Sequence, residues 1–159
     1  MAKGDRLDDT EDVVRAGMYP YWDADLRRVS PSAFTQEEVS VSRLAVLTRD
    51  QIVSIFERDF GARVDGEGNA KKVRGIGTAK VADIVQQAEM PLQGNLPDLV
   101  LTVIEDGIEN EPGCTNNPAH ALICGHSRAN LQQPKKITRG VAKRLVDIFD
   151  WEVLAGEAP

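Results

Sequence analysis

The chain has 159 residues, of which 42% are apolar and 28% are charged, and its formal net charge is −6 at pH 7. This length predicts one domain that buries roughly two-thirds of its unfolded surface, and no apolar run approaches the roughly 20 residues of a membrane-spanning helix. With two cysteines and no apolar signal segment near the N-terminus, we expect a cytoplasmic protein that has neither a disulfide framework nor a membrane-spanning segment.

The N-terminal part is predicted to be a flexible segment over residues 1–16, followed by one α+β domain over residues 17–155. Residues 5–12, DRLDDTED, carry five acids against one arginine, and such a run favours a solvated, frayed segment with a short helix at its end. Residues 16–34 contain two prolines and several aromatics, which predicts irregular chain with short extended pieces.

A strand and a helix are predicted next. Residues 39–47, VSVSRLAVL, begin with alternating and β-branched residues, which is typical of a strand. Thr48 resembles an N-cap, and Gln51 three residues later completes a capping-box pattern. The helix is predicted over residues 49–61, with one apolar face made by Ile52, Ile55, Phe56 and Phe60.

The next stretch, VRGIGTAKVADIV at residues 73–85, has two interpretations, and residues 63–69 before it form a Gly-rich loop. One interpretation is a helix-hairpin-helix motif around Gly75 and Gly77, which would bind a phosphate at a helix start. Val81 replaces the small alanine usual in that turn. The sequence therefore favours the other interpretation, a strand that turns into a short helix.

The C-terminal half predicts two strands and a last helix. Residues 99–104 form an unbroken apolar run, which is typical of a central strand that is buried on both faces. A loop over residues 107–118 leads to a second central strand, HALICG at residues 120–125, and Thr138 caps a helix over residues 139–151. The fold class is therefore α+β, with a small mostly antiparallel sheet of about four strands and two or three packed helices.

All cysteines and histidines of the chain lie within residues 114–126. On an extended strand, His120 and His126 would lie about 20 Å apart, so one zinc ion could not bind both. A zinc site that uses Cys124, His126 and Cys114 ranks low, and we expect neither a metal nor a cofactor. For His120 we expect a hydrogen bond from its ring to the backbone of the neighbouring turn.

Several short boxes resemble those of a family of small, largely uncharacterised bacterial proteins. The boxes are Ser32-Ala33-Phe34, Val41-Ser42-Arg43 and Asn117-Pro118-Ala119-His120-Ala121, together with GIGTAKVADI, which matches a Gly-x-Gly-Thr strand before a Val-rich helix. The resemblance spans residues 27–146 and implies fold and candidate residues rather than a reaction. The resemblance also implies that Cys114, Cys124 and His126 are not part of the pattern of this family.

The polar residues of these boxes suggest an anion-binding cleft. Arginines supply charge for a phosphate or a carboxylate, and hydroxyl and imidazole groups supply hydrogen bonds. The candidate residues are Arg27, Arg28, Ser32, Arg43 and His120. The alternative is structural, with Arg43 paired to a surface acid and Ser32 capping a turn.

Two basic tracts, residues 71–80 and 128–144, contrast with the negative net charge. If they met on one face, they could bind the phosphates of a nucleic acid, although each is also consistent with a solvated face. The nucleic-acid candidates are Lys71, Lys72, Arg74, Lys80, Lys135, Lys136 and Arg139.

Three functional hypotheses follow from the sequence. The first is a non-enzymatic binding or accessory module of a bacterial system that acts through a protein partner, because residues typical of catalysis are sparse and the charge is unevenly distributed. The second is a small enzyme or sensor with an anion-binding or nucleotide-binding cleft that uses Arg43, Ser32 and His120. The third is a nucleic-acid-binding accessory protein that uses the two basic tracts.

Overall fold

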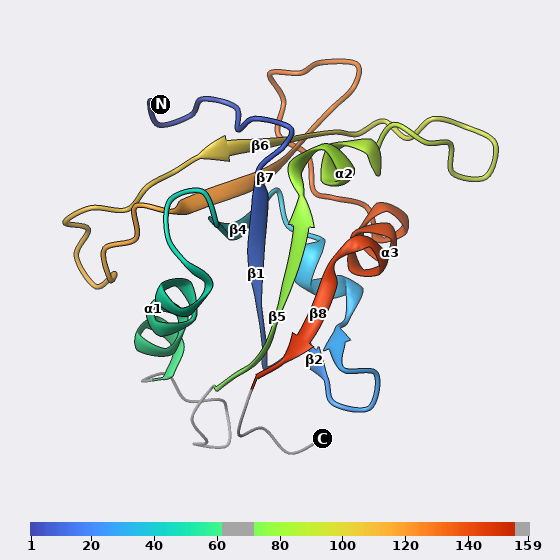
Figure 1. Cartoon of the computed structure of the whole chain (residues 1–159). Helices are drawn as coiled ribbons and strands as arrows, with labels where there is room; N and C mark the ends of the chain where they lie inside the picture. Colours follow the sequence, from blue (N-terminus) through green and yellow to red (C-terminus); the bar gives the residue numbers. More distant parts are fainter. Residues whose placement is uncertain (62–71, 155–159) are drawn as a thin grey trace.

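The computed structural model describes residues 1–61 and 72–154 and shows a sheet with helices on both of its faces (Figure 1). The strands are β1 Asp12–Met18, β2 Trp22–Asp23, β3 Arg28–Val29, β4 Glu38–Arg43, β5 Val73–Lys80, β6 Val100–Glu105, β7 His120–His126 and β8 Asp150–Val153. The helices are α1 Arg49–Gly61, α2 Val81–Gln86 and α3 Arg139–Ile148, with a 3-10 helix, η1, at Pro31–Phe34.

The described residues form a six-stranded antiparallel sheet in the order β6-β7-β4-β1-β5-β8, and β2 and β3 form a separate two-stranded ribbon. The α+β class and the antiparallel character are confirmed. The sheet has more strands than the four predicted, because β1 and β8 carry no clear strand signal in their local sequence.

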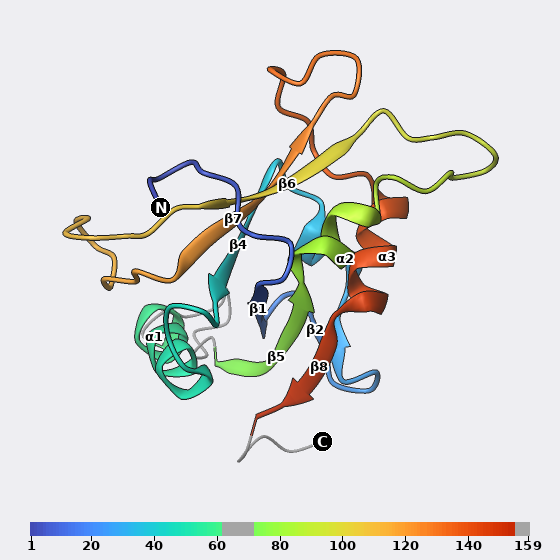
Figure 2. The same cartoon turned by 45° about the horizontal axis from the view of Figure 1, so that its top comes forward.

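The two faces of the sheet are covered by different helices (Figures 1 and 2). On one face, α2, α3 and η1 pack on a large core that includes Phe34, Ile84 and Leu145. On the other face, α1 packs on a smaller core. Val13 and Val14 of β1 belong to different cores, because successive side chains of a strand point to opposite faces. The centre of the sheet is therefore buried on both sides.

The sequence predicts a flexible segment over residues 1–16, but the structure places residues 12–16 in the interior strand β1. This strand pairs with β4 on one side and with β5 on the other. Because Val13 and Val14 are both buried, β1 lacks the alternation of apolar and polar residues that marks a half-exposed strand. With no strand pattern visible, the acidic run at residues 5–12 favoured the prediction of a frayed segment over that of a strand.

Residues further toward the N-terminus bind the outer edge of β6. The N–H groups of Gly4 and Leu7 donate to the carbonyls of Glu105 and Val103 at 2.8 and 2.9 Å, and the N–H of Glu105 donates to Asp5 at 2.9 Å. The predicted central position of residues 99–104 is therefore wrong, because β6 is the last strand of the sheet on that side, although residues 101–103 are buried in succession as predicted. The N-terminal segment satisfies the backbone groups that an edge strand would otherwise expose.

The first long helix begins with the predicted capping box. The N–H of Thr48 donates to Gln51 Oε1 at 3.0 Å, and the N–H of Gln51 donates to Thr48 Oγ1 at 3.2 Å, which satisfies two orphan donors reciprocally. The loop predicted at residues 63–69 lies outside the described residues. Within 1–61 and 72–154, no helix combines the length and the apolar character needed to cross a membrane.

The GIGTAKVADI stretch forms a strand followed directly by a short helix, which confirms the favoured interpretation. Gly75 and Gly77 lie inside β5 rather than in a turn between two helices, so the helix-hairpin-helix interpretation is wrong. A Cβ atom at Gly77 would lie 2.5 Å from the ring of Trp151, and one at Gly75 would clash with the ring of Trp22. The two glycines thus make room for two indoles that pack on β5.

The chain leaves the last helix earlier than predicted. The helix α3 ends at Ile148, and the next residues form β8 against β5. Trp151 belongs to this strand: its Nε1 donates to the carbonyl of Val146 at 2.9 Å, and its ring stacks on Phe149 with centroids 5.6 Å apart. Strand pairing and burial of the indole therefore override the helical pattern of the local sequence.

We expect Gly77→Ala to lower the free energy of unfolding by about 1–3 kcal/mol, because a methyl group would overpack the contact with Trp151. Urea unfolding measures this change. Gly140→Ala in α3 is the matched control, because its new methyl would meet only the flexible side chain of Leu92, at 3.2 Å, and alanine favours a helix by about 1 kcal/mol. A Gly77→Ala protein as stable as the wild type would contradict the proposed role of this glycine.

Candidate functional site

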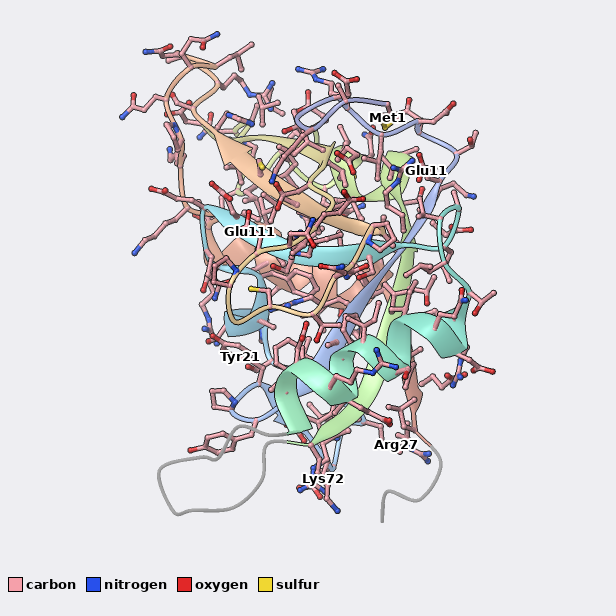
Figure 3. All side chains as sticks on the ribbon, turned by 90° about the vertical axis from the view of Figure 1, so that its left-hand side faces the viewer. Met1, Glu11, Tyr21, Arg27, Lys72 and Glu111 are labelled. Carbon is pink, nitrogen blue, oxygen red and sulfur yellow. The ribbon has the colours of Figure 1, made fainter. Side chains whose placement is uncertain are left out.

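A cleft of about 260 Å³ lies between α1, the strands β1 and β4, and the connection from β6 to β7. Figure 3 shows the molecule from this side, with α1 in front and the loop that carries Glu111 above it. The lining combines charged, polar and apolar side chains, among them Arg15, Ser42, Phe56, Asp59, Asn117 and His120. Because it gathers partly buried polar groups around His120, this cleft is the candidate site.

His120 is the first residue of β7, and Asp106 fixes the orientation of its ring. Nδ1 of His120 lies 3.0 Å from both Oδ2 and the backbone carbonyl of Asp106. The ring therefore hydrogen-bonds a backbone carbonyl, but the carbonyl belongs to Asp106 after β6 and not to the neighbouring turn at residues 117–119 that the sequence suggested. Since the carbonyl and the carboxylate are both acceptors, Nδ1 carries a hydrogen, and in the neutral form of the ring the lone pair is then on Nε2. No group in the described part of the chain hydrogen-bonds this Nε2.

Asn117 holds the start of β7 against β4. Its Nδ2 donates to Ser42 Oγ at 3.2 Å, and its Oδ1 accepts the N–H of Ala119 at 3.0 Å. Ser42 lies directly opposite His120 in the sheet, and the N–H of Arg43 donates to the carbonyl of Ala119 at 2.8 Å. The Val-Ser-Arg and Asn-Pro-Ala-His boxes, far apart in the sequence, therefore lie side by side.

Arg15 lines the cleft, and its guanidinium, which bridges from β1 to β4 and to η1 on the opposite face of the sheet, has no carboxylate partner among the described residues. It lies where β1 and β4, paired at Val13 and Val14, cease to pair. Its Nη1 and Nη2 donate to the backbone carbonyls of Ser40 and Ala33 at 3.3 and 3.1 Å. Its Nε is buried and has no hydrogen-bond partner. Burial lowers the pKa of Arg15 to about 10, although the nearby Tyr21 opposes the shift.

Asp59 of α1 brings a negative charge to the same cleft. Its Oδ1 accepts the N–H of Thr115 at 3.2 Å, which ties the β6–β7 connection to the helix. Among the described residues Asp59 has no cationic partner. Phe56 and Phe60, one turn apart, add an apolar wall, with ring centroids 6.2 Å apart.

The structure does not bring the five predicted anion-binding residues into one cavity. Arg27 and Arg28 lie in the β2–β3 ribbon, where Arg28 Nη1 lies 3.4 Å from Asp147 Oδ1, and Ser32 lies in η1. Figure 3 places Arg27 near one end of the molecule, away from the labelled Glu11. Of the five, His120 alone lines the cleft described here.

Arg43 forms an ion pair instead of lining the cleft. Its Nε and Nη2 each donate to the carboxylate of Glu11 at 2.8 Å, a bidentate geometry in a largely buried position. This hydrogen bonding, which exceeds the opposing effect of burial, raises the pKa of Arg43. Arg43 thus pairs with an acid, as in the alternative interpretation, but the pair is largely buried rather than on the surface.

The candidate metal ligands lie in the β6–β7 connection and along β7. Cys114 lies in the β6–β7 connection, and His126 lies at the far end of β7, where its Nε2 is 3.0 Å from Thr102 Oγ1. Cys124 is buried between them in the sheet, and burial raises the pKa of its thiol to about 11. In the described ranges, no group of three His, Cys, Asp or Glu side chains could hold a metal ion.

The basic tracts lie on different elements, and several of their charges are neutralised. Lys72, Arg74 and Lys80 lie on or beside β5, and Lys71 lies outside the described residues. Lys135 lies beside β7, which is separated from β5 by β4 and β1, and Lys136 and Arg139 follow it. Acids pair with two of the lysines: Asp12 with Lys80 at 3.6 Å, and Asp98 with Lys135 at 3.1 Å.

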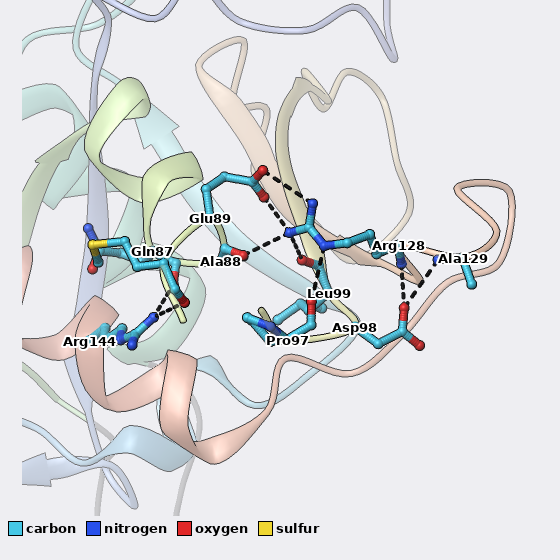
Figure 4. Close-up of polar contacts among 10 residues, drawn as sticks. Gln87, Ala88, Glu89, Pro97, Asp98, Leu99, Arg128, Ala129 and Arg144 are labelled. Carbon is cyan, nitrogen blue, oxygen red and sulfur yellow. Dashed lines mark hydrogen bonds and ion pairs between the residues drawn. The ribbon is translucent and has the colours of Figure 1, made fainter. Parts of the chain in front are cut away.

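Two further arginines of the second tract hold the connection from α2 to β6 (Figure 4). Arg128 donates to the carbonyls of Ala88, Pro97 and Leu99 at 2.8 to 3.1 Å and pairs with Glu89. Arg144 donates to the carbonyls of Gln87, Met90 and Pro91. These guanidinium groups donate to backbone carbonyls within the protein. The second basic tract therefore offers fewer free positive charges to a phosphate than its sequence indicates.

Sequence reasoning missed Arg15 and Asp59, the arginine and the aspartate among the described residues that line the cleft. Arg15 lies in a segment predicted to be flexible, and Asp59 lies on the polar side of a predicted amphipathic helix, where most acids are solvated. Searches of protein-family models, curated proteins and solved structures find no match to this chain. The resemblance to the bacterial family therefore stays a prediction, and the function is inferred from the geometry of the cleft.

Asp98 supports a testable pH dependence of stability. The hydrogen bond from Lys135, followed by those from the N–H groups of Ala129 and Arg128 and from Ser127, lowers the pKa of Asp98 to about 2. A carboxyl whose folded pKa is depressed stabilises the fold above its unfolded pKa of about 4, and this contribution is lost as the pH falls through the folded value. We therefore expect Asp98→Asn to remove part of the wild-type loss of stability between about pH 4 and pH 2.

Urea unfolding at several pH values between 2 and 5 measures that difference. Lys135→Met is the matched variant, because it removes the largest cause of the shift and keeps the carboxyl; its pH dependence should lie between those of the wild type and Asp98→Asn. Equal slopes for the wild type and Asp98→Asn would contradict this role for Asp98.

Proposed function

We propose that this protein is a binding module for a small anionic molecule, a carboxylate or a phosphate, which Arg15 holds in the cleft between α1 and the sheet. One observation carries the proposal: Arg15 lines this cleft and has no carboxylate partner in the described part of the chain. As in the sequence-based hypothesis, the function is anion binding in a cleft, and His120 is one of the residues that line it. The proposal replaces the predicted arginines with Arg15.

A guanidinium group in this position favours an anionic ligand for a physical reason. Transferring a charge out of water costs free energy unless the charge is paired and hydrogen-bonded. Two of the five N–H groups of Arg15 donate to backbone carbonyls, and the other three lack a described acceptor. An anion in the cleft would supply the missing countercharge, and the planar guanidinium matches a carboxylate or a phosphate well.

The size and the lining of the cleft limit the ligand to a small molecule. A volume of about 260 Å³ is below the roughly 300–1,000 Å³ of sites for drug-sized ligands. Phe56, Phe60 and Ile108 line part of the cleft, so a ligand with an apolar portion beside its anionic group would bury surface favourably. In this proposal, ligand occupancy is the signal that the accessory module predicted from the sequence would pass to a protein partner.

A second candidate function, a small enzyme, is favoured by the geometry of His120. Asp106 fixes the tautomer of the ring, and Nε2 has no described partner, which is the arrangement of a general base that is oriented by a carboxylate. Turnover of a bound ligand, lost in His120→Ala while binding through Arg15 remains, would favour the enzyme over the binding module. The nucleic-acid hypothesis gains no comparable support, because Lys80 and Lys135 are paired with acids.

We expect small carboxylates or inorganic phosphate to raise the melting temperature of the wild type and not that of Arg15→Met. A ligand at about 100 times its Kd stabilises a protein by about 2.7 kcal/mol, which corresponds to a rise of roughly 5–10 °C for a chain of this size. Thermal unfolding with acetate, benzoate, isocaproate and phosphate, against chloride at equal ionic strength, measures the effect.

Arg27→Met is the control variant for this experiment. It removes the same charge from an arginine outside the cleft and should keep the full response to the anion. The proposal is wrong if no anion stabilises the wild type beyond chloride, or if Arg15→Met responds as strongly as the wild type.

A further inference from the structure

The cleft contains two opposite charges that do not pair with each other. Arg15 donates to backbone carbonyls, and Asp59 accepts the N–H of Thr115 through Oδ1. Neither side chain has a partner of opposite charge among the described residues, and both line the same small cavity. We infer that the ligand is a small zwitterion, an amino acid with an apolar side chain; this inference rests on the anion-binding function proposed above.

A zwitterion satisfies the charges of the cleft better than a simple anion does. A carboxylate alone would neutralise Arg15 but would lie in the same cavity as the negative charge of Asp59. An amino acid places an ammonium group close to its carboxylate, so its two ends can meet Asp59 and Arg15, respectively. Each hydrogen bond would then be charge-assisted, and such bonds are stronger than neutral ones.

Two acceptors in the cleft are available to the three N–H donors of an ammonium group. Oδ2 of Asp59 has no described partner, because the bond from Thr115 uses Oδ1. His120 lines the same cavity and, with a neutral ring whose hydrogen lies on Nδ1 beside Asp106, offers the lone pair of Nε2. In the neutral form of this imidazole Nε2 accepts rather than donates, which suits an ammonium group better than a second anionic group.

The remaining wall of the cleft fits an apolar side chain. Phe56, Phe60 and Ile108 line it, and the two phenylalanine rings lie with their centroids 6.2 Å apart. An aliphatic or aromatic side chain of the ligand would bury apolar surface there. Leucine and phenylalanine are therefore the amino acids with which to test the inference.

Isothermal titration calorimetry with matched ligands tests the inference. Isocaproate is leucine without its ammonium group, isoamylamine is leucine without its carboxylate, and phenylpropionate is phenylalanine without its ammonium group. We expect leucine or phenylalanine to bind at least tenfold more tightly than its fragments.

Asp59→Asn should abolish this preference and leave binding of isocaproate or phenylpropionate unchanged or stronger, because asparagine can still accept the N–H of Thr115 while it lacks the charge. Glu57→Gln, on the exposed side of the same helix, should change nothing.

The outcomes separate this inference from the function on which it rests. If isocaproate or phenylpropionate binds through Arg15 as tightly as its parent amino acid, the ligand is a simple anion; the inference is then overturned while the anion-binding function stands. If the preference for the amino acid survives in Asp59→Asn, the inference is also overturned. If no carboxylate, amino acid or phosphate binds to the wild type, the proposed function itself fails.

Discussion

The cleft depends on the separation of β1 from β4 immediately after Val14. The two strands pair at Val13 and Val14 only, and the guanidinium of Arg15 then bridges to the carbonyls of Ser40 and Ala33. A guanidinium can fill that gap by hydrogen bonding to the backbone, and it does so without a countercharge. Arg15 thus bridges the gap between the two strands and is also one of the residues that line the cleft. Backbone carbonyls alone compensate a buried charge incompletely, so the position favours a ligand that supplies the remaining charge.

The opposite face of the sheet gives this arrangement a rigid support. Phe34, Phe149 and Trp151 contact one another there, with centroids 5.1 to 6.3 Å apart, and they pack the 3-10 helix and α3 against the strands. On the side of the cleft, Asn117 ties the start of β7 to Ser42 of β4. Rigid strands behind a site position its polar groups more accurately than loops do. The β6–β7 connection on the other side of the cleft is a loop, and its one described hydrogen bond to α1 runs from the N–H of Thr115 to Asp59.

The features that could be predicted from the sequence are those with a local cause. The capping box of Thr48 and Gln51 defined the start of α1, and the apolar run after Pro118 defined β7. The strands β1 and β8 were missed because their stability comes from partners distant in the sequence and from the burial of residues such as Trp151. Arg15 and Asp59 of the cleft were missed for the same reason: nothing local distinguishes a buried arginine from a solvated one, since burial is decided by tertiary packing.

The NMR signals of the arginine Nε–H groups test the central claim most directly. Comparison with Arg15→Met assigns the signal of Arg15, and the spectrum is then recorded with and without leucine. Because a ligand carboxylate would change the hydrogen bonding of this guanidinium, the account predicts that the Arg15 signal shifts as the ligand binds while that of Arg27 stays. A ligand that binds and leaves the Arg15 signal unchanged would contradict the assignment of Arg15 as the group that holds the anion.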